Sequence, residues 1–394
     1  MLSAYHLVVS WWRIGRTGFV DLPIFLDRAR NFLETGELYL ATVDAATYAP
    51  AAPVYKFPPL FGMLLLPFAR DGVDMADFRV HWILQLLAYA LAVGFAVWLF
   101  LGNKNKLVAA LGLVLALNFE PFVETLWRLQ VETPLLLLLL LAFAGMRWKR
   151  PELTGSAIGI AAMLKVYPGF LVLYFLFRRR WNVVTWAGLS AALVTVATLV
   201  VIGPDQHRLF FFEILPLLSG EPVLIDSGNV SLARHLQESG ILPAAAKSIQ
   251  VAIGLVLMAV SAVAVHRAGR RNEDETLGLC LFIALMLVVM PNSWVNYQVL
   301  LLPVLLVLLR DSFESLAHRA KMLAALAAAY LPMTFYQPCR APTVSWPCAQ
   351  TPFYLGLVQL PRGFHDAMVD LRVISAPILW ACVLVLILLR RQQR

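Results

Sequence analysis

Two carboxylates near the start of the chain are the first residues whose type and position could do chemistry. Asp21 opens a segment, residues 20–39, whose apolar spacing predicts a short amphipathic helix, and Asp27 lies inside it. A carboxylate that faces a cavity can act as a general base and accept a proton from a hydroxyl nucleophile. Asp21 could instead cap the helix by accepting backbone N–H groups. Asp27 is the rival base, although the adjacent Arg28 and Arg30 offer it an ordinary surface ion pair.

A second group has the charge and the donors that a departing phosphate needs, because negative charge accumulates on that group in the transition state. Lys165 interrupts an apolar segment, where a lysine is costly unless it is buried or near water. We therefore expect Lys165 to bind a phosphate, with Arg128, Asn229 and Ser231 as further phosphate ligands. The alternative for Lys165, a lysine that snorkels to the interface, is disfavoured by its place in the middle of the segment.

A third group could line a substrate cavity. Trp294, Asn296 and Tyr297 lie at the junction of two apolar segments, and Tyr167 follows Lys165 closely. We expect these four residues, together with Asp27, to line the substrate site. For residues 292–297, an aromatic belt at the membrane interface is an equally good interpretation.

The motifs of soluble enzymes are absent from the sequence. There is no glycine-rich phosphate loop followed by Lys-Ser or Lys-Thr, no HExxH and no GxSxG. The seven histidines are scattered without the spacing of metal ligands. We therefore expect no metal and no cofactor.

The elements that must position these residues are membrane helices. Of the 394 residues 60% are hydrophobic and 14% are charged, against about 25% charged in soluble domains. Apolar runs of about 18 or more residues can cross a bilayer as helices. Nine spans are expected, near residues 80–101, 107–123, 129–146, 183–203, 246–265, 276–291, 295–309, 322–337 and 371–389. The fold class is thus an all-α, polytopic helical bundle, treated as one domain over residues 1–394, with an N-terminal piece (1–79) and the bundle (80–394).

The charge distribution predicts the topology. Six short connections, at 102–106, 147–153, 178–182, 266–275, 310–321 and 390–394, hold 17 of the 32 Lys and Arg residues. The positive-inside rule places them in the cytoplasm, which also explains the net charge of +8 without a nucleic-acid partner. Most of the acids then lie on the extracytoplasmic face, together with Asp21 and Asn229.

Two segments do not fit simple alternation across the bilayer. Residues 154–177 have basic clusters at both ends and are interrupted by Lys165 and Pro168. We interpret them as a re-entrant helical pair whose tip lines a cavity, since irregular backbone at membrane depth needs protein or water around it. Residues 57–69 are too short to cross and are bracketed by prolines.

The start of the chain and one loop carry further expectations. Met1–Trp12 is apolar but too short to span, so either a first helix is missing, which we favour, or this piece is an amphipathic anchor. Cys339 and Cys348 flank a proline-rich loop that the topology places outside, where a disulfide between them is expected.

Six short motifs in fixed order carry a family resemblance. They are DLPIF from Asp21, KFPPL from Lys56, LQVE from Leu129, LKVYP from Leu164, GNVSL from Gly228 and SW at Ser293. They resemble the Asp-Leu-x-Val-Tyr, aromatic-Pro-Pro, Gly-Gln-x-Asn, Lys-x-Tyr-Pro, Gly-Asn-Gln-Ser-Leu and Ser-Trp-x-His-His segments of glycosyltransferase family 87. These are the bacterial polyprenyl-phosphate-mannose-dependent alpha-mannosyltransferases of the GT-C class. The match runs from about residue 20 to residue 310.

The resemblance implies an inverting, metal-free transfer of a sugar, expected to be mannose. The donor would be a polyprenyl-phosphate sugar, and the acceptor a hydroxyl of a glycolipid or glycan. The reaction would take place on the outer side of the bacterial cytoplasmic membrane, with Asp21 at the position of the catalytic aspartate. The chain departs from the family pattern at Glu132, where Asn is usual, and at Asn296-Tyr297, which replace paired histidines.

Two other functions compete with this one. A secondary transporter would also use broken helices and a polar site near the membrane midplane, but Lys165 and Pro168 have no counterpart in the second half of the chain. A non-catalytic membrane scaffold is disfavoured by the cost of an intramembrane charge.

Overall fold

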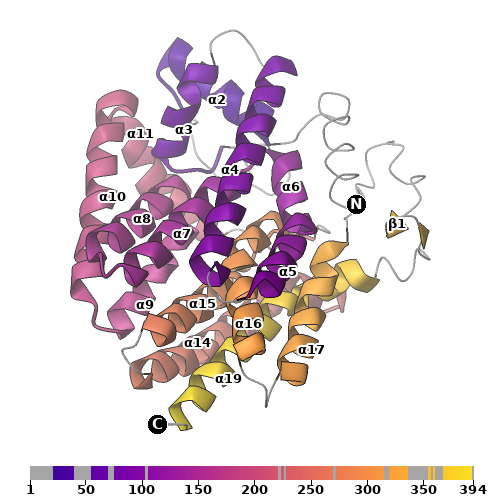
Figure 1. Ribbon diagram of the computed structural model, residues 1–394. Helices are drawn as coiled ribbons and strands as arrows, with labels where there is room; N and C mark the ends of the chain where they lie inside the picture. Colours follow the sequence, from indigo (N-terminus) through magenta and orange to yellow (C-terminus); the bar gives the residue numbers. More distant parts are fainter. Residues whose placement is uncertain are drawn as a thin grey trace. The chain divides into compact units, whose positions relative to one another are not determined.

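The computed structural model describes residues 21–39, 55–69, 75–102, 105–220, 223–225, 228–268, 272–314, 319–335, 354–355, 358–359 and 367–392. These parts are helical, apart from turns and one short antiparallel pair, β1 (Tyr354–Leu355) with β2 (Val358–Gln359). The helices dominate the ribbon in Figure 1, and the all-α prediction is confirmed. The predictions for Met1–Trp12 and for the Cys339–Cys348 disulfide fall outside the described residues.

The helices of the first 220 residues are α2 (Leu22–Thr35), α3 (Pro59–Leu65), α4 (Met75–Leu101), α5 (Lys106–Leu117), α6 (Glu120–Arg128), α7 (Glu132–Arg147), α8 (Pro151–Leu164), α9 (Val172–Phe177), α10 (Trp181–Ile202), α11 (Pro204–Leu209) and α12 (Leu215–Gly220). The later helices are α13 (Leu232–Glu238), α14 (Pro243–Arg267), α15 (Asn272–Val289), α16 (Leu302–Glu314), α17 (Arg319–Tyr330) and α19 (Ser375–Gln392). Tight turns precede three of them: η2 (Tyr167–Leu171) before α9, η4 (Val295–Leu301) before α16 and η7 (Leu371–Ile374) before α19.

Five of the described helical segments are long and apolar enough to cross a membrane: residues 79–101, 181–202, 243–267, 295–314 and 367–390. The span expected at 107–123 is bent instead. Residues 106–117 and 120–126 meet at 43°, because α5 ends at Leu117, with Asn118 as its C-cap, and α6 begins at Glu120. The protein is thus a polytopic integral membrane protein, and the count of nine spans stays a prediction.

The predicted interruption at Lys165 is confirmed. Helix α8 ends at Leu164, and Lys165 adopts an extended backbone with φ −153° and ψ 131°. The chain then turns through η2, where Pro168 lies in the first turn, before α9 begins. Whether the two arms enter and leave on one side of the membrane stays a prediction. Residues 57–69 form the short helix α3 and a 3-10 turn, as their length requires.

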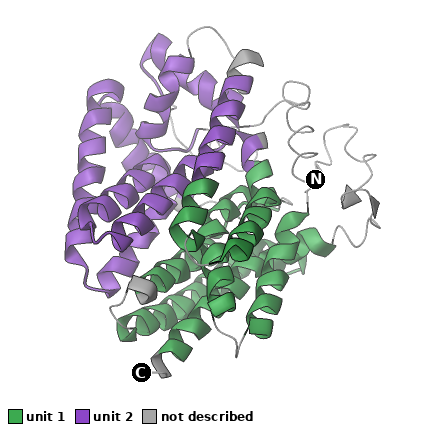
Figure 2. Cartoon of the chain, in the orientation of Figure 1, with its two compact units in different colours: residues 1–9, 93–124, 223–394 green, residues 10–92, 125–222 purple. Residues whose placement is uncertain are grey.

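The chain divides into two compact units, coloured in Figure 2. Unit 2 comprises residues 10–92 and 125–222. Inside it, α8 packs against α7 and α10. Gly155 and Gly159 allow the close approach, since a Cβ at Gly159 would clash with the carbonyl oxygen of Ala187. Small residues four apart are typical of closely packed membrane helices, and here they fix the helix that leads to Lys165.

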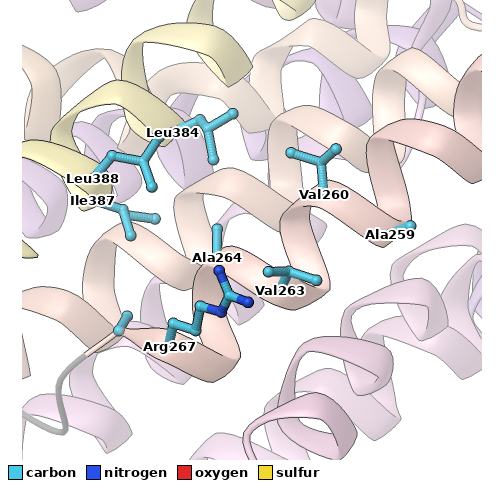
Figure 3. Close-up of a pocket in the computed structure, with 9 residues that line it drawn as sticks. Ala259, Val260, Val263, Ala264, Arg267, Leu384, Ile387 and Leu388 are labelled. Carbon is cyan, nitrogen blue, oxygen red and sulfur yellow. The ribbon is translucent and has the colours of Figure 1, made fainter.

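Unit 1 comprises residues 1–9, 93–124 and 223–394. Its core is built on α15 and α16, whose apolar side chains are almost fully buried, and α15 packs against α14 and α19. A pocket of about 350 Å³ lies between the last turns of α14 and α19 (Figure 3). Its lining is aliphatic except for Arg267, so it lacks the polar groups that a sugar would need.

Candidate active site

An aromatic cluster in unit 2 anchors α2, the helix that follows Asp21. The ring of Phe25, on α2, lies 4.9 Å from the ring of Phe57 and 5.1 Å from that of Phe61, both edge-on. The Tyr39 hydroxyl donates a hydrogen bond to the carbonyl of Phe57 (2.6 Å). Such aromatic contacts contribute beyond the area that they bury, so α2 is anchored firmly. Burial raises the pKa of the Tyr55 phenol well above its ordinary value, so this neighbouring hydroxyl stays neutral and is no rival base.

The carboxylate of Asp21 lies before the first turn of α2 but makes no capping hydrogen bond. It turns instead towards the segment that follows α6. Its Oδ2 atom accepts a hydrogen bond from Nε2 of Gln130 (2.8 Å) and lies 3.9 Å from a guanidinium nitrogen of Arg128. The side chain of Asp21 is 20% exposed. The side chain of Asp21 therefore does not cap α2, as the alternative interpretation required.

Arg128 and Gln130, the partners of Asp21, lie on either side of a strained turn at Leu129. Leu129 has φ +51°, a left-handed conformation that costs a non-glycine residue about 1–2 kcal/mol. The turn is fixed at Gln130, whose N–H donates to the carbonyl of Thr125 and whose carbonyl accepts from the side chain of Gln85. Helix α7 then begins at Glu132. The turn thus presents Gln130 to Asp21 and starts a new helix two residues later.

Lys165 lies at the other side of Gln130. Its ammonium donates to Oε1 of Gln130 (3.2 Å) and to Oε1 of Glu132 (2.5 Å). The side chain of Lys165 is 11% exposed and that of Glu132 is 0% exposed. The rings of Phe57 and Tyr167 lie 4.9 and 5.6 Å from the ammonium, within reach of a cation–π interaction. Lys165 is thus a buried, charge-paired lysine rather than a snorkelling one.

Together these contacts form one polar network inside unit 2, running from Asp21 through Gln130 to Lys165 and Glu132, with Arg128 beside Asp21. Asp21 and Arg128 are partly exposed, whereas Glu132 is sealed. The arrangement sets a proton acceptor and two cations close together, which suits a reaction that removes a proton and releases an anion.

Asp27 has the surface pairing that its neighbours predicted. Its Oδ1 lies 3.6 Å from a guanidinium nitrogen of Arg30, and its side chain is 61% exposed. In the described contacts it does not join the network around Asp21. Its predicted place beside a substrate stays a prediction.

The predicted phosphate ligands Asn229 and Ser231 lie in unit 1. The Asn229 amide is fully engaged: Nδ2 donates to Leu224 and Asn292, and Oδ1 accepts from the N–H groups of Ser231 and Ser293. The Ser231 hydroxyl caps α13 by accepting from the N–H of Arg234 (3.3 Å). Both side chains thus hold their own loop together, and a contact with phosphate stays a prediction.

The third predicted group joins that same loop. Trp294 forms an isolated antiparallel bridge with Asn229, and it starts the turn η4, in which Asn296 is buried. Tyr297 is half-buried. The predicted substrate contacts of these residues stay predictions. Among the described residues, no three His, Cys, Asp or Glu side chains come together as a metal site would require.

Sequence reasoning missed the roles of Gln130, Glu132 and Phe57, which were noticed only as parts of motifs. The signal for Glu132 was available, since an ionisable residue beside a membrane segment pairs with another one, and Lys165 needed a partner. Gln130 carried no such signal, because only the left-handed turn at Leu129 decides where its side chain points.

Comparison with known proteins agrees with these findings. Residues 55–291 match the family model of glycosyltransferase family 87. Over 318 residues, the chain is 29% identical to a polyprenol-phosphate-mannose-dependent alpha-(1-2)-phosphatidylinositol pentamannoside mannosyltransferase of Mycolicibacterium smegmatis, covering 78% of this chain and 74% of that protein. It is 26% identical over 323 residues to a polyprenol-phosphate-mannose-dependent alpha-(1-2)-phosphatidylinositol mannoside mannosyltransferase of Mycobacterium tuberculosis, covering 76% and 72%. No solved structure matches the chain.

Proposed function

Because the chain belongs to glycosyltransferase family 87 and is a membrane-bound glycosyltransferase, we propose that it transfers mannose from polyprenyl-phosphate-mannose to a hydroxyl of a glycolipid. The donor and the acceptor class follow the names of its relatives, which act on phosphatidylinositol mannosides. The family match also favours the glycosyltransferase over the transporter and the non-catalytic scaffold that the sequence left open.

The proposed reaction is a single displacement. The acceptor hydroxyl oxygen forms a bond to the anomeric carbon while the bond from that carbon to the phosphate oxygen breaks. The hydroxyl proton passes to the Asp21 carboxylate, and the electron pair of the broken bond leaves with polyprenyl phosphate. The configuration at the anomeric carbon inverts, because the nucleophile enters opposite the leaving group.

The observation that carries the proposal is the environment of Asp21. The carboxylate makes no capping hydrogen bond to α2 and is partly exposed. Its described contacts with Gln130 and Arg128 both involve the Oδ2 atom. Such a carboxylate can accept a proton through Oδ1 while its other oxygen is held. General-base assistance of this kind is worth about two to four powers of ten in rate.

The departing phosphate would meet Lys165, with Arg128 as the second cation. A preorganised ammonium in a poorly hydrated site stabilises developing negative charge more than water does. Asn229 and Ser231 are kept as further phosphate ligands, and Tyr167, Trp294, Asn296, Tyr297 and Asp27 as the lining of the substrate site. No metal or cofactor enters the proposed reaction, since the positive charge comes from side chains.

The proposed site of action is the outer side of the bacterial cytoplasmic membrane. The basic connections support this topology by the positive-inside rule, and a polyprenyl donor keeps its tail in the lipid. Labelling single-cysteine variants with an impermeant thiol reagent tests it. A cysteine at the exposed position 239, just after α13 in the same segment as Asn229, should react from outside and one at position 150 should not. Labelling at 150 from outside would refute the re-entrant model of 154–177.

The donor is tested with the purified protein in lipid nanodiscs that contain a phosphatidylinositol mannoside acceptor. Polyprenyl-phosphate-mannose, polyprenyl-phosphate-glucose and GDP-mannose are supplied separately, each with a radiolabelled sugar. We expect transfer from the first donor alone. Transfer from GDP-mannose, or faster transfer of glucose than of mannose, would overturn the proposal.

A further inference from the structure

Gln130 connects the proposed base to the proposed phosphate-binding lysine. Its Nε2 donates to Oδ2 of Asp21 (2.8 Å), and its Oε1 accepts from the ammonium of Lys165 (3.2 Å). The two ends of one amide thus meet the two ionised groups on which the proposed function rests.

The direction of this amide is fixed by chemistry. An ammonium can only donate, and an ionised carboxylate can only accept. Lys165 therefore requires the carbonyl end of the Gln130 amide, which leaves the NH₂ end for Asp21. In the reverse orientation, the NH₂ group of Gln130 would face the Lys165 ammonium, donor against donor. Its carbonyl oxygen would face the Asp21 carboxylate, acceptor against acceptor. Among uncharged side chains, Asn and Gln combine a donor and an acceptor in this way, and Asn is one methylene shorter.

The backbone of Gln130 is held as well as its side chain. Its N–H donates to Thr125, its carbonyl accepts from Gln85, and the left-handed Leu129 sets the direction of the turn. Gln130 is 8% exposed, so water competes little for its hydrogen bonds. A group fixed at both ends can hold a neighbouring carboxylate in one orientation.

The geometry points to Gln130 as a positioning residue of the transfer reaction, an inference that rests on the proposed function. Gln130 donates a hydrogen bond to Oδ2 of Asp21 and so fixes the orientation of the carboxylate. The other oxygen, Oδ1, then faces the hydroxyl group of the glycolipid substrate. The two hydrogen bonds of the Gln130 amide also form a continuous chain from the Lys165 ammonium to the Asp21 carboxylate. Hydrogen bonds in such a chain polarise and strengthen one another.

The test uses two substitutions with different losses. Gln130→Leu removes both hydrogen bonds. Gln130→Glu keeps the size of the side chain and the contact with Lys165 but removes the donor to Asp21 and adds a like charge. A hydrogen bond to a charged group is worth about 1.5–3 kcal/mol, so kcat should fall about 10- to 100-fold in both variants, while KM for the lipid donor changes less than threefold.

Gln206→Leu is the matched control, since within the part of the chain that the structure describes the Gln206 side chain accepts from the backbone N–H groups of Leu38 and Tyr39 in the same unit and has no contact with the network around Asp21. It should keep its kcat even where its thermal stability falls. Wild-type kcat in Gln130→Glu would show that size and the lysine contact suffice, and it would overturn the inference.

A double-mutant cycle separates this inference from the proposed function. If Gln130 acts through Asp21, Gln130→Leu should lower kcat only slightly in an Asp21→Asn background, because the effects of substitutions at interacting residues are not additive. A full, additive loss in that background would refute the positioning role and leave the proposed function standing. Wild-type transfer by Asp21→Asn alone would instead refute the function of Asp21 itself.

Discussion

Two of the buried ion pairs among the described residues are alike in chemistry and differ in their surroundings. In unit 2, Lys165 pairs with Glu132 at 2.5 Å, and the network continues to the partly exposed Asp21 and Arg128. In unit 1, Arg372 pairs with Glu120 at 2.9 Å, and their side chains are 0% and 1% exposed. The first pair lies beside groups that solvent can reach, and the second is enclosed.

The contacts of the enclosed pair are structural. The Nε of Arg372 donates to the carbonyl of Pro332, and its own carbonyl accepts from the side chain of Gln298. Arg372 thereby connects η7 with the ends of helices distant in sequence. A carboxylate and a cation in an apolar sequence therefore do not by themselves mark a reactive site. What distinguishes the proposed site from the enclosed pair is its connection to partly exposed polar groups.

The largest effect is expected from breaking the enclosed pair. Arg372→Met leaves Glu120 buried without its counter-charge, which costs about 3–5 kcal/mol of stability. Thermal unfolding in detergent should move to a clearly lower temperature, while the fraction that remains folded keeps its transfer rate per molecule. Adding Glu120→Gln should recover much of the stability. Wild-type stability in the single variant would mean that the pair is not sealed as described.

The next effect tests the pair in the network. Lys165→Met alone would strand Glu132 in the same way, so the lysine is removed in a Glu132→Gln background and compared with Glu132→Gln as the matched control. Loss of one preorganised donor to a developing anion costs about 2.7–4 kcal/mol of barrier. Transfer should therefore fall about 10²- to 10³-fold between the two variants at similar stability. Equal rates would make Lys165 a structural lysine and Arg128 the next phosphate ligand to test.

The smallest effect is expected in the loop of unit 1. Asn229→Ala removes four hydrogen bonds that hold its neighbours, and unsatisfied buried groups cost about 1–3 kcal/mol. We expect lower thermal stability together with a donor KM that rises more than about threefold, since Asn229 is a proposed phosphate ligand. Lower stability with a donor KM within threefold of wild type would make Asn229 a structural residue and would refute its proposed contact with the donor phosphate.

The helices could be predicted where length and hydropathy decide them. The expected spans at 80–101, 183–203 and 246–265 agree with α4, α10 and α14 to within a few residues, since an uninterrupted apolar run has few alternatives to a helix. The break at Lys165 was also predictable, because an intramembrane charge and Pro168 coincide there.

The contacts of the site could not be predicted in the same way. Where a span was expected at 129–146, helix α7 begins at Glu132, because Leu129 takes a left-handed conformation that its residue type does not indicate. Arg372 and Glu120 are separated by most of the chain, and periodicity within a segment carries no information on such a pairing. The capping and general-base interpretations of Asp21 differ only in the orientation of its carboxylate. Tertiary contacts decide that orientation, and the local sequence does not show them.

The central claim is that Asp21 accepts the proton of the acceptor, and one comparison tests it directly. Single-turnover transfer from polyprenyl-phosphate-mannose is measured for Asp21→Asn and for Asp27→Asn, both in nanodiscs and both checked for wild-type unfolding temperature. The account predicts a loss of about two to four powers of ten for Asp21→Asn, and less than threefold for the exposed, Arg30-paired Asp27. A near-normal rate for Asp21→Asn, or the larger loss for Asp27→Asn, would contradict it.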